Sequence, residues 1–305
     1  MLTPPFTADD FLSVVGQAFA LPENEVREYA KPRASSLASC ARQQAYAMAG
    51  TEHDEIGVEG SARQIDGALT AEQGRMFEDL SVRVIEEMGF SVVDRQLALP
   101  DDYPVTGHPD GRLYEGGDGL VWGFEHKHLG RYSYEKILKE GLLAAEPGFI
   151  LQSGLYGDAL GWDAALFVVV AQDSSAVRGD ITANLRAKNP DRRWSVYPGI
   201  NPKVNIVPVD LRPVKHGLIP LAHERAEWLT DWKRRSGKPA DVAREFDPTI
   251  TEEKWIADGE GGRVTVDRAP FPCGWCPYYA KCLADGPGGQ AAPPLPWTAK
   301  VESSD

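Results

Sequence analysis

The chain has 305 residues, a formal net charge of −13 and 42% hydrophobic residues, a composition typical of a folded globular protein. A chain this acidic is not expected to coat DNA nonspecifically, because proteins that do so are usually basic. No apolar run approaches the ~20 residues of a membrane-spanning helix, and residues 1–10 hold prolines and acids rather than a basic signal segment. We therefore expect a cytoplasmic protein with no membrane partner.

Hydrophobic spacing predicts helices in the first quarter of the chain. Residues 1–30 are expected to be helical, and residues 35–46 to form a helix that begins at a serine and contains Cys40. Residues 50–68 are polar and rich in glycine, which predicts a loop. Residues 69–88 predict an amphipathic helix that ends at a glycine.

The remaining elements predict a mixed sheet with helices around it, the α/β class. Their expected ranges, in chain order, are strands 90–99, 105–114 and 120–129, helices 132–145 and 149–160, a fully buried strand 164–171, a strand 204–211 and a helix 213–235. We divide the chain into an N-terminal helical part, 1–68; a core, 69–215; a C-terminal helical part with three cysteines, 216–283; and a flexible tail, 284–305.

Two carboxylates and a lysine are expected to converge on the second and third of these strands. Asp110 lies on one strand, and Glu125 and Lys127 share a face of the next, since residues i and i+2 point the same way. Such a group is costly to bury unless a cation joins it, and Mg²⁺ or Mn²⁺ prefers oxygen ligands. A lysine beside the ion can orient an attacking water. The alternative is a solvated strand end, because acidic-x-Lys also occurs at residues 231–233 and 252–254.

Helices on either side of this motif carry further candidates. Glu78 lies near the middle of the helix 69–88, where it either faces solvent or supplies a third acidic ligand. Gln152 and Tyr156 are four residues apart and therefore share one face of the helix 149–160. The side chain of His126 alternates with those of Glu125 and Lys127, so we expect it to point away from them.

A locally basic segment between residues 178 and 215 contrasts with the acidic chain. Basic side chains interleaved with aromatic ones suit a single-stranded nucleic acid, whose phosphates are neutralised and whose bases stack. A solvated loop of mixed charge is an equal alternative for each residue. The candidate DNA-binding residues are Arg192, Arg193, Trp194 and Tyr197.

The chain has four cysteines, and three of them are crowded into the pattern Cys-x2-Cys-x5-Cys at Cys273, Cys276 and Cys282. In a cytosolic protein, four cysteines are more often metal ligands than disulfides. The fourth ligand is then Cys40, and such a set binds Zn²⁺ or a [4Fe–4S] cluster. A structural zinc usually uses two Cys-x2-Cys pairs, so the single pair favours the cluster.

Taken together, the motifs resemble those of the RecB-like nucleases of the PD-(D/E)XK superfamily that carry an iron–sulfur cluster. These include CRISPR-adaptation nucleases, AddB-type recombination nucleases and phage exonucleases. The resemblance covers roughly residues 33 to 283 and departs from many members at the helix position, where they have histidine. The matching segments, in chain order, are Cys40, Gly74-x3-Glu78, Gly107-x-x-Asp110, Glu125-His126-Lys127, Gln152-x3-Tyr156 and Cys273-x2-Cys276-x5-Cys282.

This resemblance implies a restriction-endonuclease-like core and a DNA exonuclease that favours single strands or free ends, in recombination, repair or phage DNA processing. It implies that Asp110, Glu125, the backbone carbonyl of His126 and Glu78 hold Mg²⁺ or Mn²⁺. Lys127 would orient water, and Gln152 and Tyr156 would place the DNA or hold Lys127. Recombination or CRISPR-adaptation proteins are candidate partners. Two alternatives remain: a non-catalytic nucleic-acid-binding module, and a zinc-stabilised protein without a nuclease site.

Overall fold

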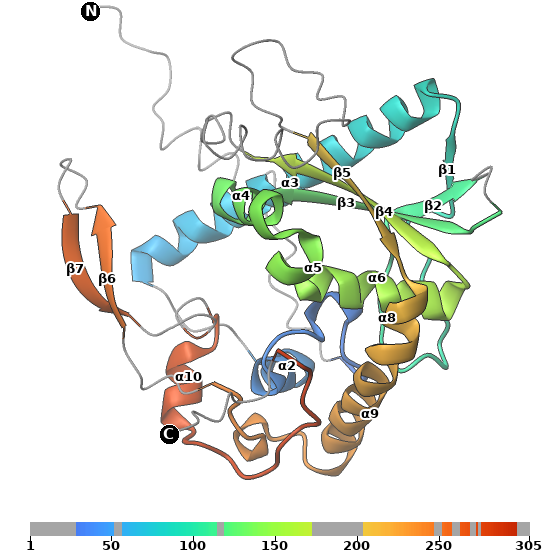
Figure 1. Ribbon diagram of the computed structural model, residues 1–305. Helices are drawn as coiled ribbons and strands as arrows, with labels where there is room; N and C mark the ends of the chain where they lie inside the picture. The colour runs from blue at the N-terminus through green and yellow to red at the C-terminus, as the bar shows by residue number, and fades with distance from the viewer. Residues whose placement is uncertain are drawn as a thin grey trace, which may run out of the picture.

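A mixed five-stranded sheet forms the centre of the computed structural model (Figure 1). The structure describes residues 29–51, 57–114, 119–172, 204–246, 252–257, 263–268, 273 and 276–297. The spatial order of the strands is β1 (Ser91–Val93), β2 (Gly111–Tyr114), β3 (Trp122–Leu129), β4 (Ala164–Ala171) and β5 (Val204–Asp210). The β3–β4 pair is parallel and the other three pairs are antiparallel. The predicted α/β class and the antiparallel β1–β2–β3 meander are thereby confirmed.

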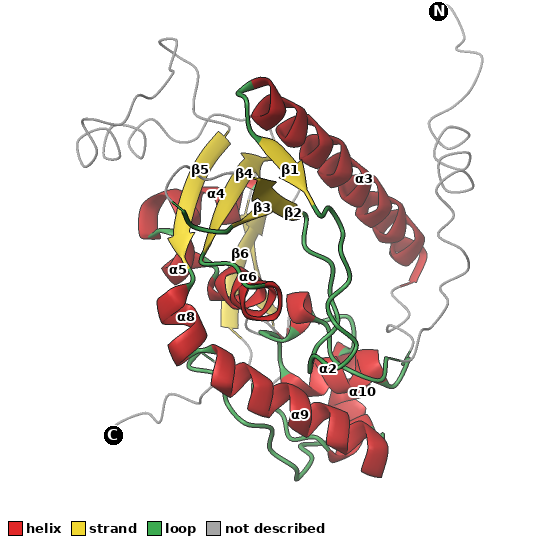
Figure 2. Cartoon of the chain, turned by 90° about the vertical axis from the view of Figure 1, so that its right-hand side faces the viewer, coloured by secondary structure: helices red, strands yellow, loops and turns green. Residues whose placement is uncertain are grey.

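Helices cover both faces of the sheet. Helix α3 (Gly57–Glu87) contacts β1 and β3, whereas α4 (Arg131–Glu140) and α6 (Pro147–Leu160) contact β3 and β4. Figure 2 shows α3 on one side of the sheet and the segment from α4 to α6 on the other. That segment is the crossover connection that a parallel strand pair requires. None of the described helices is both long and apolar enough to cross a membrane.

The remaining elements lie beyond the sheet. They are η1 (Ala34–Ser36), α2 (Ala41–Met48), α5 (Leu142–Ala145), α8 (Arg212–Gly217), α9 (Ile219–Arg235), η2 (Pro239–Asp241), the hairpin of β6 (Glu252–Ala257) and β7 (Arg263–Arg268), and α10 (Tyr279–Ala284). Helices α2, α9 and α10, from both ends of the described chain, form a second region beside the sheet (Figures 1 and 2). The hairpin falls in a segment for which the sequence pattern predicts no element.

The two faces of β3 have different surroundings. Phe124 packs with Val82 of α3 in a small apolar cluster, whereas Glu125 and Lys127 face α6. Residue 123 must be glycine, because a Cβ there would overlap the ring of Trp162. Strand β4 is almost entirely buried, as expected for the central strand of such a sheet. These neighbours fix which side chains of β3 face α6.

Several predicted boundaries are wrong for local reasons. The single helix predicted over 35–46 is divided into η1 and α2, and Cys40 is the N-cap residue of α2 rather than a residue inside a helix. Residues 57–68, predicted as a loop, are the first part of α3. The first predicted strand ends early, because Asp94 and Gln96 adopt positive φ angles of 53° that turn the chain.

The predicted flexible tail, 284–305, is wrong for the residues that the structure describes there, which end at residue 297. Leu295 is fully buried in the main apolar core, and the indole Nε1 of Trp297 donates to the carbonyl of Ala38 at 3.4 Å. Gln290 forms a parallel β-bridge with Val242. Residues 284–297, although rich in glycine and proline, are therefore packed against the second region. We call this segment the strap.

Candidate functional site

Glu125 and Lys127 form an ion pair in the middle of the sheet. Their backbones pair with Phe167 and Val169 of β4, whereas β2 pairs only with residues 122–124 of β3. Glu125 is fully buried, and its Oε2 accepts a hydrogen bond from Lys127 Nζ at 2.8 Å. The predicted convergence of these two side chains on one face is therefore present in the structure.

Asp110 lies where β2 begins, beside the junction of Glu125 and His126. Its Oδ2 accepts a hydrogen bond from the backbone N–H of His126 at 2.7 Å. Its Oδ1 lies 3.4 Å from the amide Nε2 of Gln96, a long hydrogen bond. The carboxylate is thereby held against the strand segment that carries the other candidate ligands, as the hairpin argument predicts.

Helix α6 supports the lysine from the opposite side. Lys127 Nζ is 3.4 Å from Gln152 Oε1, and Gln152 Nε2 donates to the hydroxyl of Tyr156 at 3.1 Å. The ammonium also lies 5.1 Å from the centre of the Phe149 ring, a cation–π distance. The Tyr156 ring packs against Gly107, where a Cβ would overlap it. Phe149 was not identified from the sequence; its position three residues before Gln152 on the same helix was the available signal.

Charge and burial set the protonation of this group. Burial, with the nearby Asp110 carboxylate, raises the pKa of Glu125 to about 7, although Lys127 opposes the shift. Burial would lower the pKa of Lys127, but the carboxylates of Glu125 and Asp110 raise it. Glu125 Oε1 is buried and has no hydrogen-bond partner among the residues that the structure describes. A buried carboxylate oxygen without a partner is costly, and a divalent cation would satisfy it, so the residues fit the expected ion.

Glu78 lies close to this group but is engaged elsewhere. Its Oε1 accepts a hydrogen bond from Arg95 Nη2 at 2.9 Å, and Arg95 also binds Asp79 at 2.7 Å. Burial raises the pKa of Glu78, and the charge of Asp110 adds to the shift. Within the described ranges, no three His, Cys, Asp or Glu side chains are close enough to hold one metal ion. Glu78 as a third ligand stays a prediction, and it requires Arg95 to release the carboxylate.

The two histidines of β3 face away from this group. The imidazole Nδ1 of His126 lies 3.2 Å from the hydroxyl of Ser81 on α3, and the ring of His128 stacks on Phe77 at 4.7 Å between centroids. Burial lowers the pKa of His126 to about 4, so its ring is neutral at physiological pH. The backbone carbonyl of His126 is thus the part of that residue to consider as a ligand.

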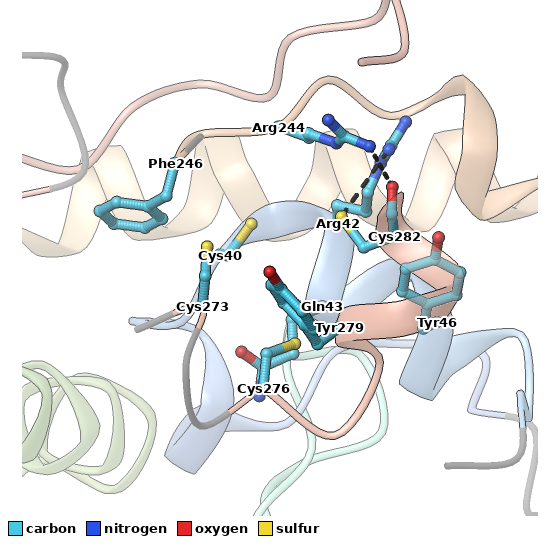
Figure 3. A pocket seen from close by; sticks show the side chains of 10 residues that line it. All are labelled: Cys40, Arg42, Gln43, Tyr46, Arg244, Phe246, Cys273, Cys276, Tyr279 and Cys282. Carbon is cyan, nitrogen blue, oxygen red and sulfur yellow. Dashed lines mark hydrogen bonds between the residues drawn. The ribbon is translucent and has the colours of Figure 1, made fainter. Parts of the chain in front are cut away.

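The four cysteines line a single pocket in the second region (Figure 3). The pocket encloses about 380 Å³ of empty space, including its opening to solvent. Its lining comprises Cys40, Cys273, Cys276, Cys282, Arg42, Gln43, Tyr46, Arg244, Phe246 and Tyr279. The four thiols form no disulfide. Four thiols around one space fit a thiolate-bound group in their chemistry, although their spacing is not that of a site closed around one ion.

A buried ion pair between Arg225 and Glu245, in the C-terminal half of the chain, supports one side of this pocket. Arg225 of α9 is fully buried and binds Glu245 Oε2 at 2.8 Å and the Ser39 carbonyl at 2.8 Å. Glu245 also accepts from the backbone N–H of Ala41, one residue after Cys40, at 2.7 Å. The cysteine-bearing N-terminus of α2 is therefore held in place by the C-terminal half of the chain.

The proposed DNA-binding residues cannot be placed. Arg192, Arg193, Trp194 and Tyr197 lie outside the described residues. The helix predicted over residues 1–30 lies almost wholly outside them as well.

Comparisons with known proteins give low similarities. No protein-family model matches the chain, and no curated protein matches it by sequence. Among solved structures, an alkaline exonuclease from Laribacter hongkongensis is 14% identical, with a TM-score of 0.38 over 68% of this chain and 92% of that one. A phage-related exonuclease from Haemophilus somnus 129PT is 12% identical, with a TM-score of 0.39 over 70% of this chain and 99% of that one.

Proposed function

We propose that this chain is a Mg²⁺- or Mn²⁺-dependent DNA exonuclease that favours single strands or free ends. The observation that carries the proposal is the buried Glu125, which has an unsatisfied oxygen and lies beside Asp110 and Lys127. A buried carboxylate oxygen without a partner is costly, and a bound cation would satisfy it. The sequence resemblance to PD-(D/E)XK nucleases points to the same chemistry, with products that carry 5′-phosphate and 3′-hydroxyl ends.

In the proposed site, Asp110, Glu125 and the His126 carbonyl hold the cation, and Glu78 joins them if Arg95 moves. The bound ion would polarise the scissile phosphate and acidify a water. Lys127 orients that water through its ammonium and stabilises negative charge as it develops. Gln152, and Tyr156 behind it, keep the ammonium pointed at the reaction centre through the contact between Gln152 Oε1 and Nζ.

The four thiols form the second part of the proposal. Cys40, Cys273, Cys276 and Cys282 would bind a [4Fe–4S] cluster that joins the two ends of the described chain. Anaerobically purified protein is expected to be brown, with broad absorbance near ~400 nm and about four irons per chain. If the purified protein instead contains one zinc per chain and no iron, the four cysteines form a structural zinc site rather than a cluster site.

The decisive experiment is digestion of single- and double-stranded DNA, labelled in turn at each end, with Mn²⁺, Mg²⁺ or chelator. We expect metal-dependent release of nucleotides from an end, faster on single strands, and its loss in Asp110→Asn. Asp210→Asn is the matched control, because this exposed carboxylate lies at the end of β5 and pairs with Arg212 rather than with a residue of the site. DNA that is bound but not cut under all metal conditions would identify a nucleic-acid-binding module instead.

A further inference from the structure

Arg42 is a buried cation at the edge of the cysteine pocket. It lies two residues after Cys40 and is completely inaccessible to solvent. Its guanidinium donates from Nε to the carbonyl of Val242 at 2.6 Å, from Nη2 to that of Ala240 at 2.7 Å, and from Nη1 to that of Gly286. Nη1 also lies 3.9 Å from Cys282 Sγ, a hydrogen-bond distance for sulfur (Figure 3).

The chain makes room for this guanidinium. Residue 288 is a glycine with φ of +72°, and a Cβ there would overlap both Arg42 Nη2 and the Val242 carbonyl. A left-handed backbone without a side chain is therefore required beside Arg42. Such a close fit indicates that the position of the cation is specified by the fold.

Arg244 is a second guanidinium at the same pocket. Its Nη2 donates to the carbonyls of Cys282 and Leu283, and its buried Nε has no hydrogen-bond partner. In the described part of the chain, neither Arg42 nor Arg244 forms an ion pair with a carboxylate. Glu245, which also lies nearby, is already paired with Arg225 at 2.8 Å.

Two cations without carboxylate partners beside four thiols are a charge imbalance. Arg42 is fully buried and Arg244 partly so, and removing a charge from water without an opposite charge nearby is costly. Four thiolates around Zn²⁺, or around a [4Fe–4S] core in its usual oxidised state, carry a net double negative charge. The two guanidiniums would balance that charge.

We infer that Arg42 and Arg244 are the counter-cations of a thiolate-bound metal centre in this pocket, and that Arg42 donates a hydrogen bond to the sulfur of Cys282 in that centre. The inference rests on the cofactor part of the proposed function, and it assigns positioning and charge-balancing roles that the sequence pattern does not give to these residues. If the centre is an iron–sulfur cluster, the arginines stabilise its more negative, reduced form and raise its reduction potential.

The test compares anaerobically prepared wild type with Arg244→Gln and Arg42→Lys. Arg244→Gln removes one positive charge and leaves the carbonyl contacts of Arg42 in place. Arg42→Lys keeps the positive charge but loses the planar guanidinium and its fixed set of donors. Lys31→Gln is the control, because Lys31 also binds only backbone carbonyls, those of Asp101 and Tyr103, outside the pocket. The readouts are metal content, the rate of metal loss to a chelator, and the midpoint potential in a dithionite titration.

We expect Arg244→Gln to release metal about tenfold faster than wild type, since roughly 1.4 kcal/mol of charge compensation is lost. For a cluster, the midpoint potential should fall by the equivalent of a tenfold change in the reduction equilibrium, ~59 mV for one electron. Arg42→Lys should release metal faster with a smaller fall in potential. If the centre holds zinc, the rate of metal loss to the chelator is the measurement that decides.

Release rates and potentials in Arg244→Gln that equal those of Lys31→Gln would overturn the inference, and so would wild type without any thiolate-bound metal. If Arg42→Lys does not fold, Arg244→Gln alone decides. The nuclease proposal fails separately, because a protein that holds its metal centre but cuts no DNA leaves these readouts unchanged.

Discussion

The two candidate sites differ in how the chain balances their charges. At the sheet, Lys127 pairs with Glu125, and Arg95 pairs with Glu78, so two of the three candidate ligand carboxylates already have a basic partner within the chain. At the cysteine pocket, Arg42 binds carbonyls and a sulfur and Arg244 binds carbonyls, and neither has a carboxylate partner among the residues that the structure describes. We therefore expect the sheet site to bind and release an ion with little effect on folding, and the cysteine pocket to depend on its proposed metal centre for stability.

The largest effect is expected at the lysine of the sheet site. Lys127→Met should reduce DNA cleavage by about 10²–10³-fold, because the substitution removes the ammonium group that stabilises the negative charge developing during the reaction. Single-turnover digestion with Mn²⁺ measures the change. Lys136→Met is the control, since Lys136 Nζ binds the carbonyl of Ala145 on the same crossover segment and does not touch the site. Undiminished cleavage by Lys127→Met would remove the lysine from the mechanism.

The cysteine pocket is expected to respond through stability. Cys40→Ser should lose the bound metal and several kcal/mol of folding free energy, because binding to such a site is also folding energy. Thermal unfolding and metal analysis measure both. Removing Mg²⁺ from wild type with a weak chelator should leave the unfolding temperature almost unchanged. Equal stability of Cys40→Ser and its neighbour control Ser39→Ala would show that the two sites do not differ in this respect.

The strap that follows α10 should contribute to stability on its own. Leu295→Ala removes a fully buried side chain and should cost about 2–4 kcal/mol of unfolding free energy. Leu283→Ala, on the exposed side of α10 with 38% of its surface accessible, should cost at most ~0.5 kcal/mol. Urea unfolding distinguishes the two. If both substitutions lower the unfolding free energy by the same amount, the segment that contains Leu295 behaves as the flexible tail that the sequence predicts.

Metal binding at the sheet should depend on pH through Glu125. Because burial raises its pKa to about 7, the carboxyl is protonated below that pH and must release its proton to bind a cation. Mg²⁺ affinity should therefore rise by up to ~10-fold between pH 6 and pH 8, with proton release detectable by calorimetry in buffers of different ionisation enthalpy. Lys127→Gln should move this rise to higher pH. An affinity independent of pH would contradict the protonated state.

The smallest effect is expected at Gln152. Gln152→Ala removes the 3.4 Å contact with Lys127 Nζ and should slow cleavage by roughly threefold to tenfold, the value of one modest hydrogen bond. Single-turnover rates measure it. Gln96→Ala is a matched comparison, because Gln96 makes a similarly long contact with Asp110. A loss as large as that of Lys127→Met would give Gln152 a direct part in the reaction.

The sheet and its site were largely predictable because short-range rules determine them. The alternation of β3 predicts that Glu125 and Lys127 share a face, and i, i+4 geometry predicts that Gln152 and Tyr156 share a face of α6. Only the family resemblance implied that these two faces meet. Partners that depend on tertiary packing could not be read in this way: Arg95 holds Glu78, and Phe149 lies beside Lys127. Whether these residues carry out catalysis stays a prediction.

The second region was harder to predict, because its contacts join distant segments. The cysteine spacing suggested a common site, but nothing local indicated that Arg42 reaches the carbonyls of Ala240 and Gly286 about 200 residues later. Glycine and proline made residues 284–297 look like a tail, although Leu295 is buried. Composition reports backbone preference, and it does not report whether a core is available to cover the segment.

The parallel pairing of β3 with β4 limits the insertions and deletions that this sequence can accept during evolution. Residues 122–129 are matched one to one with residues 164–171, and alternate side chains face opposite helices. Insertion or deletion of one residue in β3 would exchange the two faces beyond that point and put a carboxylate where Phe124 or His126 lies. A length change in β3 can survive only when a second change restores the alternation of the faces. Descendants of this chain should vary in length at residues 115–118, before the strand, and keep the strand itself at constant length.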